Sequence, residues 1–403
     1  MSLRLTDHSR SLQLLAKMLI VAILLTGCGG GGSGSSAGTA KSSFTAGAIT
    51  GFGSVIINGI RFKSSTASVA NDDDDEAQSE TDLKLGMVAE VEAGEITSDS
   101  TGSHGDAKSI HFHSAIIGPV DVIDIPTRLL VVLGQTVDVS NTTVFGDSLP
   151  NGPYSISVGG VLEIYGMLDT RTGHYVATRI ESKTNAAFFK LRGVVANLDT
   201  TARTFMIGGE TISFANLPPD QVPADLANGL LVCVKLETTK SADGVWVATK
   251  LKLAAHHVTD HNEIELKGLV TSVTSPTQFS VDGIPVDASR ATFVPDGATV
   301  VLGAEVEVEG TAIDGVIMAT KVSIENQDQD EIDGFELHGA IEMLDTTAKT
   351  FVLRGVRVSY GGSAVVFKDG TESDLADGRN VEVKGNLSSN GTMLEAKTIS
   401  FEH

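Results

Sequence analysis

Histidines occur in two close groups, and their spacing is typical of side chains that share a divalent metal ion. His111 and His113 lie two residues apart, and His256, His257 and His261 form the second group. Alternate residues of a strand point to one face, so His111 and His113 are expected to lie side by side. Imidazole nitrogens bind Zn²⁺ well. The sequence therefore predicts a candidate zinc site at each group; exposed strand ends that tolerate histidine are the alternative.

Carboxylates also gather in two runs, which supply the hard oxygen ligands that Ca²⁺ prefers. The first run contains Asp72, Asp73, Asp74 and Asp75, and the second contains Asp328, Asp330 and Asp333. Calcium held there would stiffen the joints between neighbouring domains. Neither run matches the twelve-residue calcium loop, because the sixth position counted from Asn326 is Glu331 where that loop needs glycine. Solvated charge is the alternative interpretation.

The sequence holds no motif of nucleophilic or phosphate chemistry in the structural context that such chemistry needs. No serine has the strand-to-helix context of the G-x-S-x-G nucleophile turn, and no G-x-x-x-x-G-K-[ST] loop is present. We therefore expect a protein that is not an enzyme. An esterase or glycosidase hidden in one divergent unit is a minor alternative.

The first residues predict a secretory signal. Basic side chains precede a short apolar run at 18–25, which has too few residues to span a bilayer as a helix. The next residues, Leu-Thr-Gly-Cys ending at Cys28, resemble the bacterial lipobox. That resemblance implies that Cys28 becomes the lipidated first residue of the mature chain and anchors it to a membrane. In some bacterial lipoproteins an aspartate directly after the cysteine retains the protein at the inner membrane. Gly29 stands at that position here, so the resemblance favours the outer membrane of the cell envelope.

The charge of the chain restricts its partners. The sequence has a formal net charge of −22, which repels nucleic acid phosphates. Cys233 is the only cysteine besides Cys28, so a lipidated chain has no pair for an internal disulfide. The fold must therefore be held by its apolar cores.

An internal repeat organises the chain after the lipobox. The segment LDTTARTF at 198–205 returns as LDTTAKTF at 344–351. Extending this match gives five units that begin at glycines spaced 71 or 75 residues apart: Gly47, Gly118, Gly193, Gly268 and Gly339. A fixed period of this size is the signature of a tandem array of small domains.

Each unit reads as a series of short antiparallel strands. In residues 305–309 the valines alternate with glutamates, which gives a strand one dry and one wet face. The pairs Asn58-Gly59 and Asp282-Gly283 favour type I′ hairpins. Five or six strands in so short a unit suit a small closed barrel, so we predict an all-β fold of five OB-like antiparallel β-barrels with five separate cores. A small sandwich is the alternative.

The repeat resembles a family of β-domains of unknown function in bacterial lipoproteins, with the pattern GxV…FxVxGxxV…LxxGxxVxVxG…AxxI. In the fourth unit Gly268, Phe279, Gly283, Gly303 and Val308 carry this likeness. The resemblance implies an architecture but no activity.

These observations give an expected domain order and function. The expected segments are a signal peptide at 1–27, a flexible Gly/Ser tether at 28–43, and β-domains at 44–113, 114–186, 187–258, 263–326 and 334–403. We expect a lipid-anchored envelope protein that serves as a spacer or a binding surface for protein or polysaccharide partners. A divalent-cation-binding envelope protein is the alternative.

Overall fold

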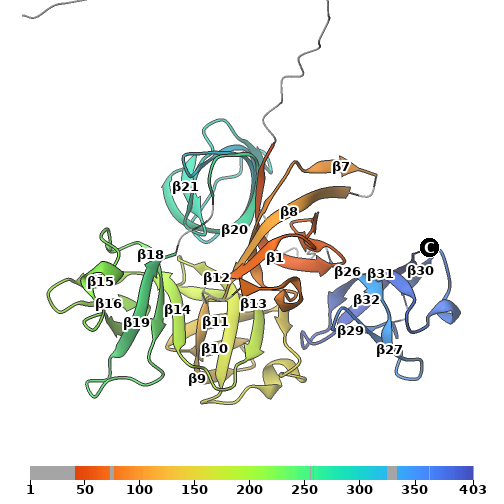
Figure 1. The fold of residues 1–403 in the computed structure, drawn as a ribbon, viewed down its shortest axis with the longest axis horizontal. Helices are drawn as coiled ribbons and strands as arrows, with labels where there is room; N and C mark the ends of the chain where they lie inside the picture. Colours follow the sequence, from red (N-terminus) through yellow and green to blue (C-terminus); the bar gives the residue numbers. More distant parts are fainter. Residues whose placement is uncertain are drawn as a thin grey trace, which may run out of the picture. The chain divides into compact units, whose positions relative to one another are not determined.

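The structure, a computed structural model, describes residues 41–72, 77–100, 102–254, 256, 258–324, 334–362 and 364–402. These residues form strands, turns and short 3₁₀ helices, and no α-helix occurs among them (Figure 1). The fold class is therefore all-β, as the alternating sequence predicts. Within these residues no helix is long and apolar enough to cross a membrane. The strands fall into five groups that follow the sequence repeat, and we number them as units 1 to 5.

Units 1 and 2 contain the first thirteen strands. Unit 1 consists of β1 (Ser43–Phe52), β2 (Val55–Ile57), β3 (Ile60–Lys63), β4 (Ser68–Asn71), β5 (Ala77–Gln78), η1 (Glu80–Asp82), β6 (Val88–Ala93), β7 (Thr97–Asp99) and β8 (Gly102–His113). Unit 2 consists of β9 (Ile116–Asp124), β10 (Leu129–Val132), β11 (Gln135–Phe145), η2 (Gly152–Ser155), β12 (Val161–Asp169) and β13 (His174–Ser182).

Units 3 to 5 contain the remaining strands. Unit 3 consists of β14 (Phe189–Val194), β15 (Ala196–Asp199), β16 (Thr204–Ile207), β17 (Glu210–Ser213), η3 (Pro219–Gln221), β18 (Leu231–Leu236) and β19 (Trp246–Leu253). Unit 4 consists of β20 (His261–Ser275), β21 (Gln278–Val281), β22 (Ile284–Asp287), β23 (Thr292–Val294), β24 (Glu305–Ile313) and β25 (Val316–Ile324). Unit 5 consists of β26 (Phe335–Ala340), β27 (Glu342–Asp345), β28 (Thr350–Leu353), β29 (Val356–Ser359), β30 (Val366–Lys368), η4 (Glu372–Asp374), β31 (Asn380–Leu387) and β32 (Leu394–Phe401).

Units 2 and 4 are closed barrels of five strands. In unit 4 the ladders run from β20 to β21, β22, β25 and β24 and back to β20, and in unit 2 from β9 to β10, β11, β13 and β12 and back to β9. One ladder in each ring is parallel. Units 3 and 5 follow the same order, but their first strand is interrupted at Val195 and Ile341. Closure leaves few free strand edges in each barrel.

Glycines allow the chain to pass where a side chain would collide. A Cβ on Gly268 would lie 2.2 Å from the Asp282 Oδ2 atom, because the hairpin turn folds over the start of the unit. A Cβ on Gly310 would lie 2.3 Å from the Met318 carbonyl oxygen, at a bulge between β24 and β25. The glycines that open the units therefore leave room for a side chain of the following hairpin, and Gly310 leaves room for the backbone of the opposite strand.

The hairpin turns have the geometry that their sequences predict. Asn58 and Gly59 have φ of 51° and 77°, and Asp282 and Gly283 have φ of 48° and 89°. Positive φ at both central residues defines the type I′ turn, whose twist matches that of the flanking strands. The prediction of these hairpins is confirmed.

Buried apolar side chains form three clusters rather than the five separate cores that the repeat predicts. One cluster joins units 1 and 5, a second joins units 2 and 3, and a third lies in unit 4. The third also includes Phe44 and Ala46 from the first strand of unit 1. Units of this size bury little surface alone, so cores that merge with a neighbour's bury more.

Ladders between units account for this merging. The β1 strand pairs in parallel with β20 at Ser43 to Ala46 and with β26 at Gly51 and Phe52. The β9 strand pairs with β14. Strand pairing therefore links units that are not neighbours in the sequence.

Candidate functional site

A cavity of about 320 Å³ lies where strands of units 1 to 4 meet. Its polar wall contains Glu90 from β6, His113 from β8, Arg192 from β14, His256 from the segment after β19, and Asp282 from the β21–β22 turn. Its apolar wall includes Met167, Leu231 and Leu253. A small number of polar groups set in an apolar lining is typical of pockets for small molecules.

His256 lies at the centre of the polar wall. Its Nδ1 atom lies 2.5 Å from the Glu90 Oε1 atom, and its Nε2 atom lies 2.6 Å from the Asp282 carbonyl oxygen. The Glu90 side chain is only 3% exposed, so this contact is shielded from water. The Arg192 Nη2 atom lies 3.2 Å from the His256 Nε2 atom. These contacts connect units 1, 3 and 4 through one imidazole.

His113 is buried in the same wall and is held neutral. Burial lowers the pKa of His113 well below its usual 6.5, and the charges of Arg192 and Lys190 lower it further. Its Nδ1 atom is buried and finds no hydrogen-bond partner among the residues that the structure describes. A buried nitrogen without a partner costs free energy unless something else bonds it.

Asp282 adds a carboxyl group that titrates near neutral pH. Burial raises the pKa of Asp282 to about 6, although the charges of His256 and Arg192 oppose this rise. The carboxylate packs against the backbone of Gly268. Ionised and neutral forms of this group therefore both occur in the physiological range.

The structure describes only some of the residues that the sequence predicts as metal ligands. His111 Nδ1 lies 3.1 Å from Asp72 Oδ1, and His261 Nε2 lies 3.3 Å from Thr259 Oγ1. His113 and His256, from the two predicted zinc groups, line one cavity instead of two sites. The other predicted residues lie outside the described residues: Cys28, Asp73, Asp74, Asp75, His257, Asp328, Asp330 and Asp333.

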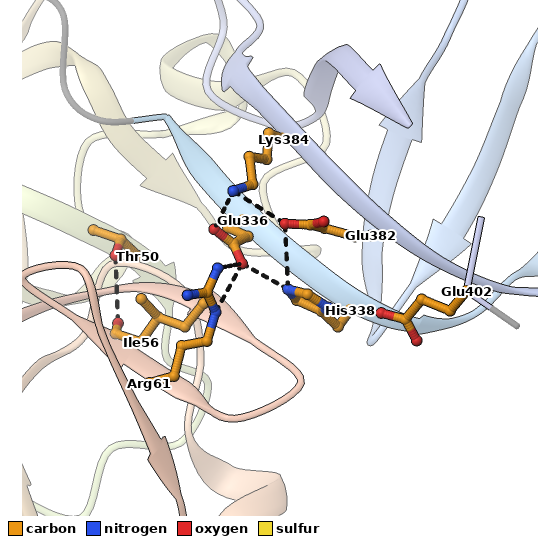
Figure 2. Close-up of polar contacts among 8 residues, drawn as sticks. All are labelled: Thr50, Ile56, Arg61, Glu336, His338, Glu382, Lys384 and Glu402. Atoms are coloured by element: carbon orange, nitrogen blue, oxygen red, sulfur yellow. Dashed lines mark hydrogen bonds and ion pairs between the residues drawn. The ribbon is translucent and has the colours of Figure 1, made fainter. Parts of the chain in front are cut away.

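A second polar cluster links unit 1 to unit 5, and sequence reasoning missed it. Figure 2 shows Arg61 of β3 pointing at Glu336 of β26, with Lys384 of β31 on the other side. Glu336 Oε1 lies 2.5 Å from Arg61 Nη2 and 2.6 Å from His338 Nε2, and Glu336 Oε2 lies 3.1 Å from Lys384 Nζ. The sequence places Glu336 and His338 on one face of a strand, which could have indicated a polar cluster. Arg61, the partner of Glu336, lies 275 residues away and could not be predicted.

Within the described residues, this cluster also contains the only three grouped donor side chains whose spacing would suit a metal ion. Donor atoms of Glu336, His338 and Glu382 lie within 4.8 Å of one another. However, His338 Nδ1 lies 2.8 Å from Glu402 Oε1, so both ring nitrogens face carboxylates. Burial lowers the pKa of His338, but the hydrogen bonds to Glu336 and Glu402 outweigh it and the pKa is raised. A protonated imidazole has no lone pair for a metal, so the cluster acts as an ion-pair network.

Glu336 is the hub of that network. Burial alone would raise the pKa of Glu336, but hydrogen bonds from His338, Arg61 and Lys384 lower it to about 2. The side chain is 13% exposed, so water screens these contacts only in part. The negative charge is thus fixed over almost the whole pH range.

Comparisons with known proteins identify the repeat but no activity. No curated protein matches the sequence of this chain. The solved structure described as "drosophila Unr CSD456" aligns with 55% of this chain and 99% of its own length, at 11% identity and a TM-score of 0.14. Residues 117–181, 267–323 and 338–399, in units 2, 4 and 5, match the family described as "Domain of unknown function (DUF5666)". The chain therefore carries a repeated DUF5666 domain, a domain of unknown function, in three regions.

Proposed function

We propose that the protein is a non-enzymatic, lipid-anchored component of the bacterial cell envelope. Its five units are OB-like barrels of one type, and together they form a binding surface for a protein or polysaccharide partner. The observation that supports a rigid surface best is the set of ladders between units: β1 with β20 and β26, and β9 with β14. Backbone pairing of this kind resists relative motion between domains far better than a polar contact surface.

A cleft beside Tyr154 favours a polysaccharide as the partner. The Tyr154 side chain is 73% exposed, which is unusual for a large aromatic residue. A cleft of about 100 Å³ beside it is also lined by Asp124, Arg128 and Asn390. A flat ring flanked by hydrogen-bonding groups suits a sugar, which presents both apolar C–H faces and hydroxyls.

The experiment is affinity capture of envelope polysaccharide by the full chain. We expect the wild-type protein to retain a polysaccharide fraction, and Tyr154→Ala to retain at least about tenfold less. Val158→Ala, which changes another exposed apolar side chain outside the cleft lining, is the matched control and should behave as wild type. Equal retention by Tyr154→Ala and wild type, or capture of proteins alone, would contradict the polysaccharide partner.

The anchor is tested separately with Cys28→Ala. The native chain should sediment with membranes and incorporate a labelled fatty acid, whereas Cys28→Ala should do neither. Labelling of the variant would refute lipidation at Cys28. The alternative of divalent-cation binding is tested by calorimetric titration with Ca²⁺ and Zn²⁺, in which heat of binding would support it.

A further inference from the structure

The guanidinium of Arg192 lines the cavity and has few partners among the described residues. Arg192 is half-buried, and its one side-chain hydrogen-bond contact there is with His256 at 3.2 Å. Arg192 forms no ion pair with any residue that the structure describes. Its charge lowers the pKa of Asp282, but the Asp282 carboxylate lies against Gly268, and Glu90 contacts His256. Because an arginine presents five N–H donors in a planar fork, this single contact leaves donors for a ligand.

The second observation concerns His113, whose side chain is buried and only 7% exposed. Its buried Nδ1 atom lacks a partner, and His113 lines the same cavity as Arg192. Two separate observations, an arginine without an ion pair among the described residues and an unsatisfied buried nitrogen, thus fall in the lining of one cavity. The rest of the wall is largely hydrocarbon, with Met167, Leu231 and Leu253 among its residues.

We propose that this cavity binds a small organic carboxylate, with its carboxylate on Arg192 and its hydrocarbon part on the apolar wall. The planar guanidinium matches a carboxylate with two parallel hydrogen bonds, a geometry that a lysine would not offer. The volume of about 320 Å³ lies at the lower end of small-molecule pockets, which restricts the ligand to a short acid. This site is distinct from the Tyr154 cleft, so the two proposals can fail independently.

The test uses hexanoate, with hexanol and hexylamine as probes of the same length but different charge. The full chain is labelled with ¹³C at its methionine methyl groups and titrated with each probe. Met167 lines the cavity, whereas Met343 is 78% exposed and lies outside it. Hexanoate is expected to shift the Met167 resonance saturably and leave Met343 unchanged. Hexanol and hexylamine should bind at least about tenfold more weakly, since neither forms a bidentate ion pair with a guanidinium.

Two variants then test whether Arg192 binds the carboxylate of hexanoate. Arg192→Gln should weaken hexanoate binding by about tenfold or more and leave hexanol binding unchanged. Arg357→Gln removes an exposed arginine of β29 and serves as the matched control. Equal binding of hexanol and hexanoate to the wild-type chain would overturn the proposal, as would an unmoved Met167 resonance. Because these two readouts need no variant, the proposal remains testable even if Arg192→Gln does not fold.

Discussion

Replacing Glu336 with glutamine is expected to loosen the junction between units 1 and 5. The folded state holds the pKa of Glu336 at about 2, against its usual 4.5. This difference corresponds to about 3 kcal/mol of stabilisation at neutral pH, an upper value because the contacts are shared among three cations. Glutamine keeps the shape of the side chain but removes the charge.

The assay is native-state hydrogen exchange, because a chain of several units does not give one well-defined unfolding transition. Amides of β26 and of the β1 residues paired with it should exchange up to about a hundredfold faster in Glu336→Gln. Amides of β19 in unit 3 serve as the internal control and should not change. Glu372→Gln removes an exposed pair with Lys349 and should have little effect.

The pH dependence of the same junction follows from the two shifted groups. The folded-state pKa of Glu336 is lowered, so its contribution is complete above about pH 4.5 and is lost as the pH falls towards 2. The pKa of His338 is raised above 6.5, so its contribution is complete below that pH and is lost as the pH rises through the folded value. Protection of β26 should therefore be greatest between about pH 4.5 and 6.5. Unchanged exchange in Glu336→Gln, or equal acceleration in β19, would refute this reasoning.

Two further predictions concern the bulge glycines and a buried carboxyl. Gly310→Ala should destabilise unit 4 by about 1–3 kcal/mol because its Cβ meets backbone, whereas Gly94→Ala, which meets nothing within 4 Å, should be neutral or slightly stabilising; native-state hydrogen exchange of the strands that hold each glycine's neighbours compares them. Burial and the charges of Glu307 and Glu309 raise the pKa of Glu265 to about 8, so the folded state loses stability as the pH rises from 4.5 to 8. Glu265→Gln should therefore raise the hydrogen-exchange protection of β20 amides at pH 8.5 and leave it almost unchanged at pH 4; a rise of equal size at both values would exclude this origin.

Much of the fold could be predicted because it depends on local sequence. Alternating valines and glutamates specify strands, and Asp282-Gly283 specifies a hairpin, without reference to the rest of the chain. The prediction of five separate cores was wrong, because the partner of an outer strand is set by contacts between units. Nothing near Gly51 indicates that its neighbour is Glu336 of unit 5.

The candidate cavity, too, could be predicted from the sequence only in part. The sequence singled out His113 and His256 as residues with chemistry, and the structure brings both to one wall. Their roles could not be predicted as clearly, because Glu90 and Arg192 come from strands of other units. Burial and neighbouring charge, which decide protonation, are properties of the assembled fold alone.

The pairing of β1 with strands near the other end of the chain has a kinetic consequence. During synthesis, unit 1 is made long before β26, and Arg61 has no partner in unit 5 until Glu336, 275 residues downstream, has been added. Until then an unpaired strand edge is open to other chains, which is the usual route to aggregation. Slow maturation and a need for chaperones are therefore expected of this protein, and truncation of unit 5 should destabilise unit 1 more than unit 4, its neighbour in the sequence.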